Sequence, residues 1–516
     1  MSKQELMKYA NDPFWVRLRT FLFILFWVVW VAMLVGAVLI IILAPGCPAT
    51  ASLPWYKKCA LVRINVAVNS TASPKDQLAQ ASSQVTALKD NLDALKSADL
   101  DGILVSGLDP FLLANLDNNT HEETEKFRSA VSDLVQAAHD DGVKSKVIFD
   151  LSLGMTSDQH SWFKAYGNGS IYNDFYLYLQ KEQESQEGPN LVWNFNSDAL
   201  LRYGGKYQGT ASLNYGNAEL KEKMHALVLA WVRTKLDGIQ TSGDFYVKHS
   251  DGNIRASSEA NMLVHKWVKS GGQNKALMIV DSELASTAMK EGEEGASFEL
   301  APETALWKSL AKEDKLKEAL SKLFTEYEQQ GDIVEQTNAS TPVDVGAGWR
   351  SFQVMLPTTP GNAIADKFRK PIAEGVLAAF YLLPKSTPII QTEGAATEQL
   401  AKLKSDEFVA KLAKLRREQS ESFMLGTTKL PKVDSDEVFA LYRVYKDKNA
   451  YLLLINFAGT SKEIKVEGNF PDPNVFTSRV VLTDSEHKSS LGKEVQMGNL
   501  KLEPNEVLLV EFAPKE

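Results

Sequence analysis

The chain has few cysteines, few histidines and no excess of positive charge. Its 516 residues include two cysteines and seven histidines, and no two histidines fall in the HExxH spacing. The chain is therefore not a small domain held by disulfides, and it offers no familiar pattern of metal ligands. A formal net charge of −9 provides no basic surface for nucleic acid. The sequence also has no P-loop and no glycine-rich dinucleotide loop, so we expect neither a cofactor nor a metal.

One long uncharged segment lies near the N-terminus. Residues 21–43 read FLFILFWVVWVAMLVGAVLIIIL, a run of 23 residues without a charge. A helix of this length can cross a hydrocarbon layer of about 30 Å. The apolar part of a cleaved signal peptide is shorter, roughly 7 to 15 residues. We therefore predict a retained transmembrane helix.

The charges beside this segment predict its orientation. Arg17 and Arg19 come just before it, whereas the first basic residue after it is Lys57. The positive-inside rule then places residues 1–20 in the cytoplasm and the chain from about Ala44 onward outside. All four Asn-x-Ser/Thr sequons follow the segment, which agrees with a type II glycoprotein. The sequons begin at Asn69, Asn118, Asn168 and Asn338.

The two cysteines lie in or beside an expected neck, residues 44–58. Cys47 stands in an Ala-Pro-Gly-Cys-Pro stretch four residues beyond the apolar run, where Pro and Gly disfavour a helix. A thiol at this place can reach a neighbouring membrane protein. Cys59 precedes an apolar run, so we expect it to be buried. A bridge between Cys47 and Cys59 is the other arrangement that the spacing permits.

From residue 59 to about residue 425, short apolar runs alternate with amphipathic stretches. This alternation is typical of βα units and predicts a parallel (β/α)8 barrel. Strands are expected at residues 60–66, 102–106, 146–151, 237–241, 276–280 and 387–391, with weaker candidates at 296–300 and 343–347. Helices are expected at residues 84–96, 122–139, 219–235 and 407–418.

Two further regions depart from the barrel pattern. Residues 161–207 are rich in Tyr, Asn, Gly and Trp without a sustained period, and they are too long for an ordinary βα loop. We interpret them as an insertion after the third strand. Residues 426–516 contain alternating segments typical of half-buried antiparallel strands, so we expect a C-terminal β-sandwich domain. Its strands are expected at residues 438–445, 450–457, 461–466, 475–482 and 507–512.

The segment LDGIQTSG at residues 236–243 resembles an active-site strand of the α-amylase superfamily. There the similar segment reads Val-Asp-Gly-Phe-Arg-x-Asp-Ala, with an Arg beside the nucleophilic Asp. In this chain the two positions hold Gln240 and Ser242. Further points of resemblance are Asp150 at a strand end, Leu213-Asn-Tyr before a long helix, and Leu453-Leu-Ile-Asn-Phe in the C-terminal domain. The resemblance implies an amylase-like barrel without its nucleophile.

Other catalytic positions of that superfamily are also changed. Gly154 and Met155 stand where the resemblance implies Asn-His, and residues 348–353 contain no His-Asp pair. A retaining glycosidase requires two carboxylates. Asp281 or Glu283 could still occupy the place of the general acid after the fifth strand. An acid without a nucleophile leaves no glycosyl-enzyme route.

The remaining polar residues near the expected barrel mouth have a structural interpretation. We expect Asp150 to accept hydrogen bonds from loop amides rather than to contact a substrate. Gln240 and Ser242 are expected to be barrel-mouth residues whose hydrogen bonds are satisfied.

Within that superfamily, the chain most resembles the 4F2-type heavy chains of heteromeric amino-acid transporters. The matching segments are residues 2–6, 15–17, 44–47, 60–64 and 500–509. By this resemblance Cys47 matches the cysteine that joins the heavy chain to a multi-span light chain, and the light chain carries the amino acids. The chain departs from the pattern at Cys59 and in the length of residues 161–207, which leaves the identity of the light chain open.

The resulting hypothesis is a non-catalytic heavy chain that binds, stabilises and delivers a transporter light chain to the plasma membrane. Its partners would be the light chain and the membrane. The first alternative is a membrane-anchored α-glucosidase-type hydrolase that uses Asp281 or Glu283. The second is an adhesion or integrin-associated scaffold.

Overall fold

The computed structural model describes most of the chain between residues 12 and 514. The described ranges are residues 12–43, 54–69, 72–113, 121–140, 144–167, 170–180, 191–196, 201–272, 274–280, 301–303, 306–331, 350–359, 362–383, 386–445, 448–474 and 476–514. The N-terminal helix belongs to one compact unit. The described residues from Pro54 onward belong to a second, here called the large unit. Each unit is described by itself.

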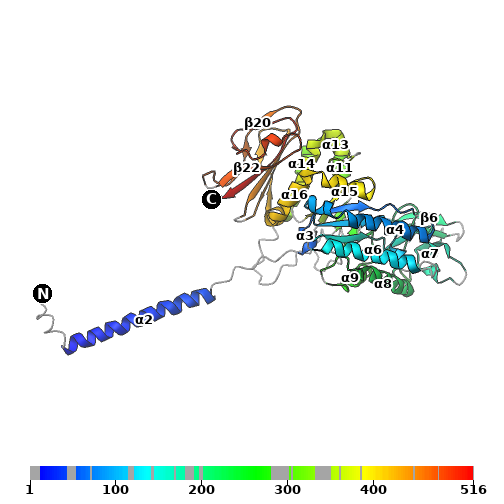
Figure 1. Cartoon of the computed structure of the whole chain (residues 1–516), viewed down its shortest axis with the longest axis horizontal. Helices are drawn as coiled ribbons and strands as arrows, with labels where there is room; N and C mark the ends of the chain where they lie inside the picture. Colours follow the sequence, from blue (N-terminus) through cyan, green and yellow to red (C-terminus); the bar gives the residue numbers. More distant parts are fainter. Residues whose placement is uncertain are drawn as a thin grey trace. The chain divides into compact units, whose positions relative to one another are not determined.

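The N-terminal unit contains helix α2 (Pro13–Leu43), which has 31 residues (Figure 1). By length and composition the helix could cross a membrane over Pro13–Leu39. It begins eight residues before the predicted start at residue 21. Asp12 accepts the amide of Phe14 through Oδ1 at 2.9 Å, and Pro13 suits the first helical position. Arg17 and Arg19, which precede the apolar run, therefore lie on the helix. Arginine is also a residue that favours helix formation.

The large unit is built around eight parallel strands. They are β1 (Leu61–Asn65), β2 (Gly102–Ser106), β3 (Lys146–Asp150), β9 (Gly238–Ser242), β12 (Ala276–Val280), β13 (Ala301–Glu303), β14 (Arg350–Met355) and β15 (Ser386–Gln391). Their order in the sheet is β12-β9-β3-β2-β1-β15-β14-β13, and β12 also contacts β13, which closes the barrel. The predicted (β/α)8 fold and six of its strands are confirmed. The weaker candidates at residues 296–300 and 343–347 lie outside the described residues, and β13 and β14 begin at Ala301 and Arg350.

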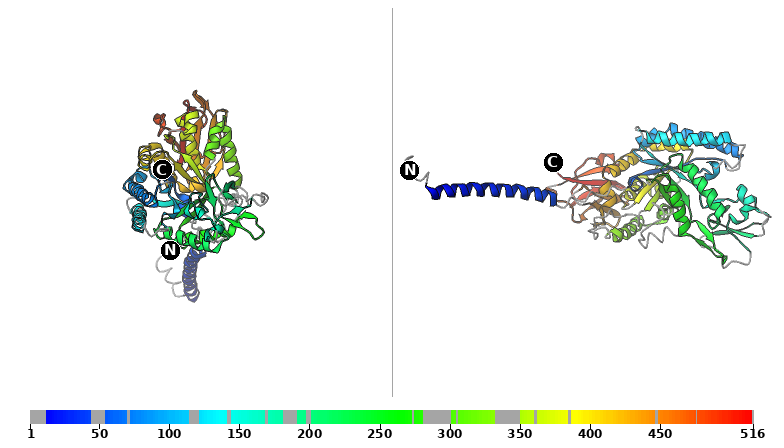
Figure 2. Two further views of the ribbon diagram at one scale, coloured as in Figure 1. Left: turned by 90° about the vertical axis from the view of Figure 1, so that its right-hand side faces the viewer. Right: turned by 90° about the horizontal axis from the view of Figure 1, so that it is seen from below.

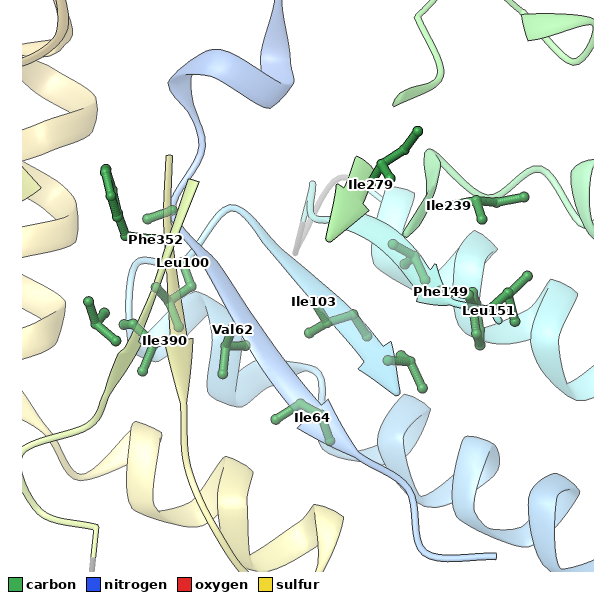
Figure 3. Close-up of a cluster of buried hydrophobic side chains, with 14 of the residues drawn as sticks. Val62, Ile64, Leu100, Ile103, Phe149, Leu151, Ile239, Ile279, Phe352 and Ile390 are labelled. Atoms are coloured by element: carbon green, nitrogen blue, oxygen red, sulfur yellow. The ribbon is translucent and has the colours of Figure 1, made fainter. Parts of the chain in front are cut away.

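Alternate residues of each strand face opposite sides of the barrel wall. Val62, Ile64, Ile103 and Phe149 belong to the main core cluster between strands and helices (Figure 3). A second, smaller cluster contains Cys59 and the strand residues that point to the other side of the barrel wall. It comprises Cys59, Leu61, Leu104, Ile148, Met278, Ile389 and Met424. Parallel strands buried on both faces therefore appear in the sequence as continuous apolar runs.

The barrel helices cover the outer face of the sheet. They include α4 (Pro74–Asp90), α5 (Asp93–Ser97), α6 (His121–His139), α8 (Ala218–Val232), α9 (Ser258–Lys269), α11 (Leu306–Lys312), α12 (Leu316–Gly331), α13 (Ala363–Phe368), α14 (Lys370–Leu382), α15 (Ala396–Lys404), α16 (Glu407–Glu418) and α17 (Ser420–Leu425). Helices α4 and α6 lie side by side (Figure 2). The predicted helix at residues 84–96 was wrong in its bounds: Ser73 caps α4 with Pro74 at its first position, and the chain turns at Asn91.

Residues 161–207 form secondary structure of their own. The segment contains α7 (Ser161–Lys164) and a three-stranded sheet in the order β5-β7-β6, made of β5 (Tyr178–Leu179), β6 (Val192–Asn196) and β7 (Leu201–Gly205). Aromatic rings fill the space beneath it. Phe163, for example, lies 4.8 Å from Tyr203 and 5.2 Å from Tyr176 between ring centroids. Contacts between residues so far apart in the chain do not produce a periodic sequence pattern. This explains why the strands of this segment were not predicted.

The C-terminal region is an antiparallel β domain, as predicted. Its main sheet has the order β16-β18-β19-β24-β22, from β16 (Thr427–Lys429), β18 (Val438–Val444), β19 (Ala450–Asn456), β24 (Val507–Pro514) and β22 (Phe476–Thr483). One face packs on β20 (Lys462–Ile464), β21 (Val466–Glu467) and β23 (Leu500–Leu502). The other face joins the barrel core, where Gly375 of α14 lies against Ile455 and Val507. The expected domain boundary at residues 425/426 stays a prediction.

Candidate functional site

Asp150 lies at the carboxyl end of β3, where barrel enzymes place catalytic groups. Its Oδ2 is 2.5 Å from Nη2 of Arg63 in β1, and Arg63 also donates from Nε to Ser106 Oγ at 3.2 Å. Burial raises the pKa of Asp150, and the Arg63 guanidinium opposes that shift. The predicted bonds from loop amides were wrong: among the described residues, the partner of Asp150 is the half-buried guanidinium of Arg63. The carboxylate is therefore already used inside the protein.

Gln240 is paired directly with Asp150 in the register of β3 and β9. Its side chain is completely buried. The amide is near enough to Asp150 to lower the pKa of that carboxyl, but neither amide atom makes a hydrogen bond of normal geometry within the protein. The expectation that Gln240 is satisfied was therefore wrong.

Ser242 ends β9 and is half-buried. It pairs in register with Val280. Among the described residues, its hydroxyl has no hydrogen bond to a histidine or carboxylate that could activate it. The next residue, Gly243, has φ 74°, and the stem of Lys206 lies 3.4 Å from where its Cβ would stand. The insertion thus covers the end of this strand.

Gly154 and Met155 both pack within the fold. Gly154 lies against Phe245, whose Cδ1 is 3.6 Å from where a Cβ would stand. Met155 is buried and begins the short strand β4 (Met155–Ser157), which pairs with β8 (Thr210–Ser212). Asp281 and Glu283 lie outside the described residues. Within the described residues, no group of three His, Cys, Asp or Glu side chains could hold a metal ion.

The acidic residue of the LDGIQTSG segment, Asp237, lies at the opposite end of the barrel. Oδ1 is 2.9 Å from Lys146 Nζ, and Oδ2 accepts the amide of Val147 at 3.0 Å and lies 2.6 Å from His139 Nε2. The carboxylate thereby joins β9 to β3 and α6. Asp237 therefore has a structural role: its carboxylate holds neighbouring elements together.

Two groups of polar residues at the barrel mouth were not predicted. Arg63 is visible in the sequence as one cation within an apolar strand, which is a signal for a buried partner. Gln391 of β15 donates to Gln353 Oε1 of β14. Gln391 ends the apolar run of β15, Gln353 stands inside β14, and neither belongs to a sequence motif. Only the parallel register of β14 and β15 therefore brings them together.

The predicted membrane and neck residues differ in how far the structure describes them. Cys47 lies outside the described residues, as do Asn118, Asn168 and Asn338. Asn69 is described and exposed. Cys59 is buried and free, as expected for a core residue. Burial raises the pKa of its thiol well above the ordinary value, which disfavours the reactive thiolate.

Gln240 provides a direct test of the barrel-mouth geometry. Because its buried amide lacks partners, Gln240→Met is expected to raise the free energy of unfolding by about 1 kcal/mol. The neighbouring Thr241→Val is the matched control, since Thr241 Oγ1 accepts the Leu153 amide at 3.1 Å and its loss should cost about 1 kcal/mol. Urea unfolding of both variants measures the difference. A Gln240→Met variant less stable than the wild type would contradict this account.

Two family models match parts of the chain. Residues 1–62 match the model described as the solute carrier family 3 member 2 N-terminus. Residues 124–253 match the α-amylase catalytic domain. The first match covers the whole helix α2, and the second covers β3, the whole insertion at residues 161–207 and β9.

Curated relatives agree with the first model. The amino acid transporter heavy chain SLC3A2 of Oryctolagus cuniculus is 34% identical over 170 residues, which cover 32% of this chain and 30% of that protein. The same heavy chain of Rattus norvegicus is 30% identical over 169 residues. In these stretches the chain is similar to amino-acid transporter heavy chains of the 4F2 type. The matched stretch spans about a third of the length of these relatives.

Amylase-type proteins are also similar to this chain. The 4-alpha-glucanotransferase of Thermotoga maritima is 27% identical over 129 residues, 24% of this chain and 29% of that enzyme. The solved structure of trehalose-6-phosphate hydrolase from Bacillus licheniformis superposes with a TM-score of 0.62 at 15% identity. It covers 89% of this chain and 100% of the hydrolase. At that identity the likeness concerns the fold alone.

Proposed function

We propose that this chain is the heavy subunit of a heteromeric amino-acid transporter. It binds a multi-span light chain through helix α2 and a disulfide at Cys47, stabilises that partner and directs it to the plasma membrane. The observation that carries the proposal is the match of residues 1–62, which include both α2 and Cys47. The type II orientation, with the large unit outside the cell, follows from the positive charges before the apolar run.

The large unit supports a role without catalysis. Asp150 is neutralised by Arg63, Gln240 occupies the place of the arginine beside the nucleophile, and Ser242 has no activating base among the described residues. Glycosyl transfer through a covalent intermediate requires a nucleophilic carboxylate and an acid. The barrel would then serve as a folded surface above the partner.

Helix α2 presents apolar side chains along its length. Trp27 and Trp30 contact one another edge to face with their centroids 5.5 Å apart, and both are exposed within the unit. Gly36 has nothing within 4 Å of where a Cβ would stand. A small residue at this position lets a partner helix approach closely. The helix therefore offers both a bulky and a smooth surface for packing.

Non-reducing electrophoresis of the full-length chain from cells tests the proposal. The wild type is expected to run as a heavy complex that collapses on reduction, and Cys47→Ser should abolish that complex. Cys59→Ala is the matched control, because Cys59 is buried and free; its complex should persist. An unchanged monomer for the wild type, or a complex that survives Cys47→Ser, would count against the disulfide.

The second candidate function is that of a membrane-anchored glycoside hydrolase. It is favoured by the amylase-like barrel and by similarity to proteins such as the α-glucosidase of Pediococcus pentosaceus, 26% identical over 169 residues. Incubation of the full chain with maltose-type substrates separates the two candidates. Turnover that disappears on replacing Asp281 or Glu283 would establish catalysis; no turnover supports the heavy-chain role alone.

A further inference from the structure

A cavity of about 330 Å³ lies where the barrel meets the C-terminal sheet. Helices α14, α15 and α16 form one side of it. The end of β22 and the following turn η6 (Lys488–Ser490) form the other. Neither Asp150 nor Gln240 of the barrel mouth lines it. The cavity is thus a second concave site, within the size range of small-molecule pockets.

Charges of the two signs balance around this cavity. Four lysines and four carboxylates line it: Lys370, Lys402, Lys411, Lys488, Glu374, Asp406, Glu407 and Asp484. A lining of equal and opposite charge disfavours a simple anion or a simple cation, because either would face as many like charges as opposite ones. A ligand that carries one charge of each sign would meet partners for both.

Some of these charged groups could still form an ion pair or a hydrogen bond with a ligand. Lys411 is exposed and makes no ion pair among the described residues. Asp406 accepts the Val409 amide through Oδ1 at 3.1 Å, whereas its Oδ2 receives only a long contact of 3.5 Å from Thr358. Glu407, by contrast, is paired with Lys488 at 2.9 Å. An anionic group could therefore reach Lys411, and a cationic group could reach Asp406.

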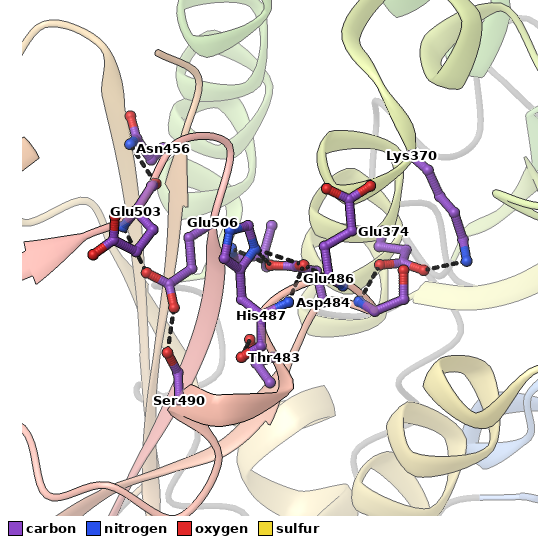
Figure 4. Close-up of polar contacts among 12 residues, drawn as sticks. Lys370, Glu374, Asn456, Thr483, Asp484, Glu486, His487, Ser490, Glu503 and Glu506 are labelled. Carbon is purple, nitrogen blue, oxygen red and sulfur yellow. Dashed lines mark hydrogen bonds and ion pairs between the residues drawn. The ribbon is translucent and has the colours of Figure 1, made fainter. Parts of the chain in front are cut away.

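Glu374 lies deeper in the cavity wall and is 1% exposed. Oε2 accepts the amide of Ser485 at 2.8 Å, and Oε1 lies 3.5 Å from Lys370 Nζ (Figure 4). A carboxylate has about four acceptor sites, so Oε1 retains unused capacity. Burial also raises the pKa of Glu374, with Asp484 acting in the same direction. A ligand ammonium here would offset that cost.

Apolar side chains complete the lining. Phe408 and Leu482 are buried beside the charged groups. Leu491 is 43% exposed, which is unusual among the leucines of the large unit. It offers apolar area that an aliphatic group could cover, at about 25 cal/mol per Å².

We propose that this cavity binds a small dipolar ligand with one carboxylate, one ammonium and an aliphatic side chain. A free aliphatic amino acid is the simplest such molecule. Its carboxylate faces Lys411, its ammonium faces Asp406 and Glu374, and its side chain lies on Leu491. This binding belongs to the chain itself and goes beyond the proposed subunit role, since it needs no light chain.

Calorimetric titration of the full-length chain, purified in detergent without other subunits, tests the proposal. L-Leucine is expected to bind, while 4-methylpentanoate, which lacks the ammonium, and leucinamide, which lacks the carboxylate, should bind about tenfold more weakly. Lys411→Met should weaken leucine binding by a similar factor. Lys414→Met is the matched control, since it lies on the same helix outside the cavity lining and should bind as the wild type does.

Three outcomes would overturn the proposal. Absence of leucine binding at millimolar concentration removes it, equal binding of 4-methylpentanoate indicates a simple anion site, and equal binding by Lys411→Met places the ligand elsewhere. All three are independent of the Cys47 complex. Failure here therefore leaves the subunit role untouched, and failure of that role leaves this result untouched.

Discussion

Replacing Arg63 with methionine is expected to destabilise the large unit by about 3 to 5 kcal/mol. Arg63 and Asp150 form an ion pair at 2.5 Å whose side chains are 26% and 12% exposed. Removing the cation leaves a buried carboxylate without its partner, and Ser106 Oγ also loses the Arg63 Nε–H donor. Thermal and urea unfolding of the purified chain measure the loss.

A double variant separates the cost of a broken pair from the value of the pair. In Arg63→Met with Asp150→Leu both charges are absent, and apolar side chains occupy the same place. Replacement of a buried pair in this way is often neutral, so most of the lost stability should return. A single Arg63→Met variant as stable as the wild type would contradict the ion pair.

The pH dependence of Arg63→Met provides a second readout. Burial already raises the pKa of Asp150, so the protonated carboxyl is favoured by the fold. Stability from this group is greatest at acid pH and is lost as the pH rises from the ordinary pKa to the raised one. Without the arginine the folded pKa should rise further. The variant should therefore regain stability in acid relative to the wild type, and the gap should widen toward neutral pH.

Replacing Asp237 with alanine is expected to cost about 2 to 3 kcal/mol. Its carboxylate accepts the Val147 amide at 3.0 Å and contacts Lys146 and His139 from neighbouring elements. The alanine variant leaves that amide buried without an acceptor. Urea unfolding monitored by tryptophan fluorescence measures the change.

Asp237→Asn is the graded control for this prediction. An asparagine can still accept from Val147 through its amide oxygen, but it loses the charge that faces Lys146. Its stability should therefore fall between the wild type and Asp237→Ala. If both variants are as stable as the wild type, the contacts of Asp237 do not stabilise the barrel, and the Asp-Gly of the segment needs another explanation.

The barrel could be predicted because its signal is local. Strands such as β2 and β12 are continuous apolar runs whose bounds matched the prediction, and α16 ran from Glu407 to Glu418 as expected. The predictions were less accurate where the stabilising contacts are distant. Rings such as Phe163 and Tyr203 are 40 positions apart and meet only in the folded insertion.

The barrel mouth illustrates the same limit at a single site. That Gln240 and Ser242 stand where the resembling amylase segment has an arginine and an aspartate is visible from the sequence, because it concerns residue identity. The partner of Asp150 is not visible, since Arg63 lies 87 positions away and the contact depends on the register of β1, β2 and β3. Nor could the sequence indicate that the Gln240 amide is enclosed without partners.

The sequence by itself determined the apolar run of α2, the sequons, the residue types in the amylase-like segment and six of the eight barrel strands, because each depends on neighbouring residues or on residue identity. Only the tertiary structure decided that Asp150 is neutralised, that Asp237 joins two strands and a helix, and that eight charged residues from the barrel and the C-terminal domain surround one cavity. The physical reason is the separation along the chain of the residues that interact. Hydrophobic periodicity acts within a few residues, whereas the energy of a charge depends on whichever groups the completed fold brings within a few ångströms.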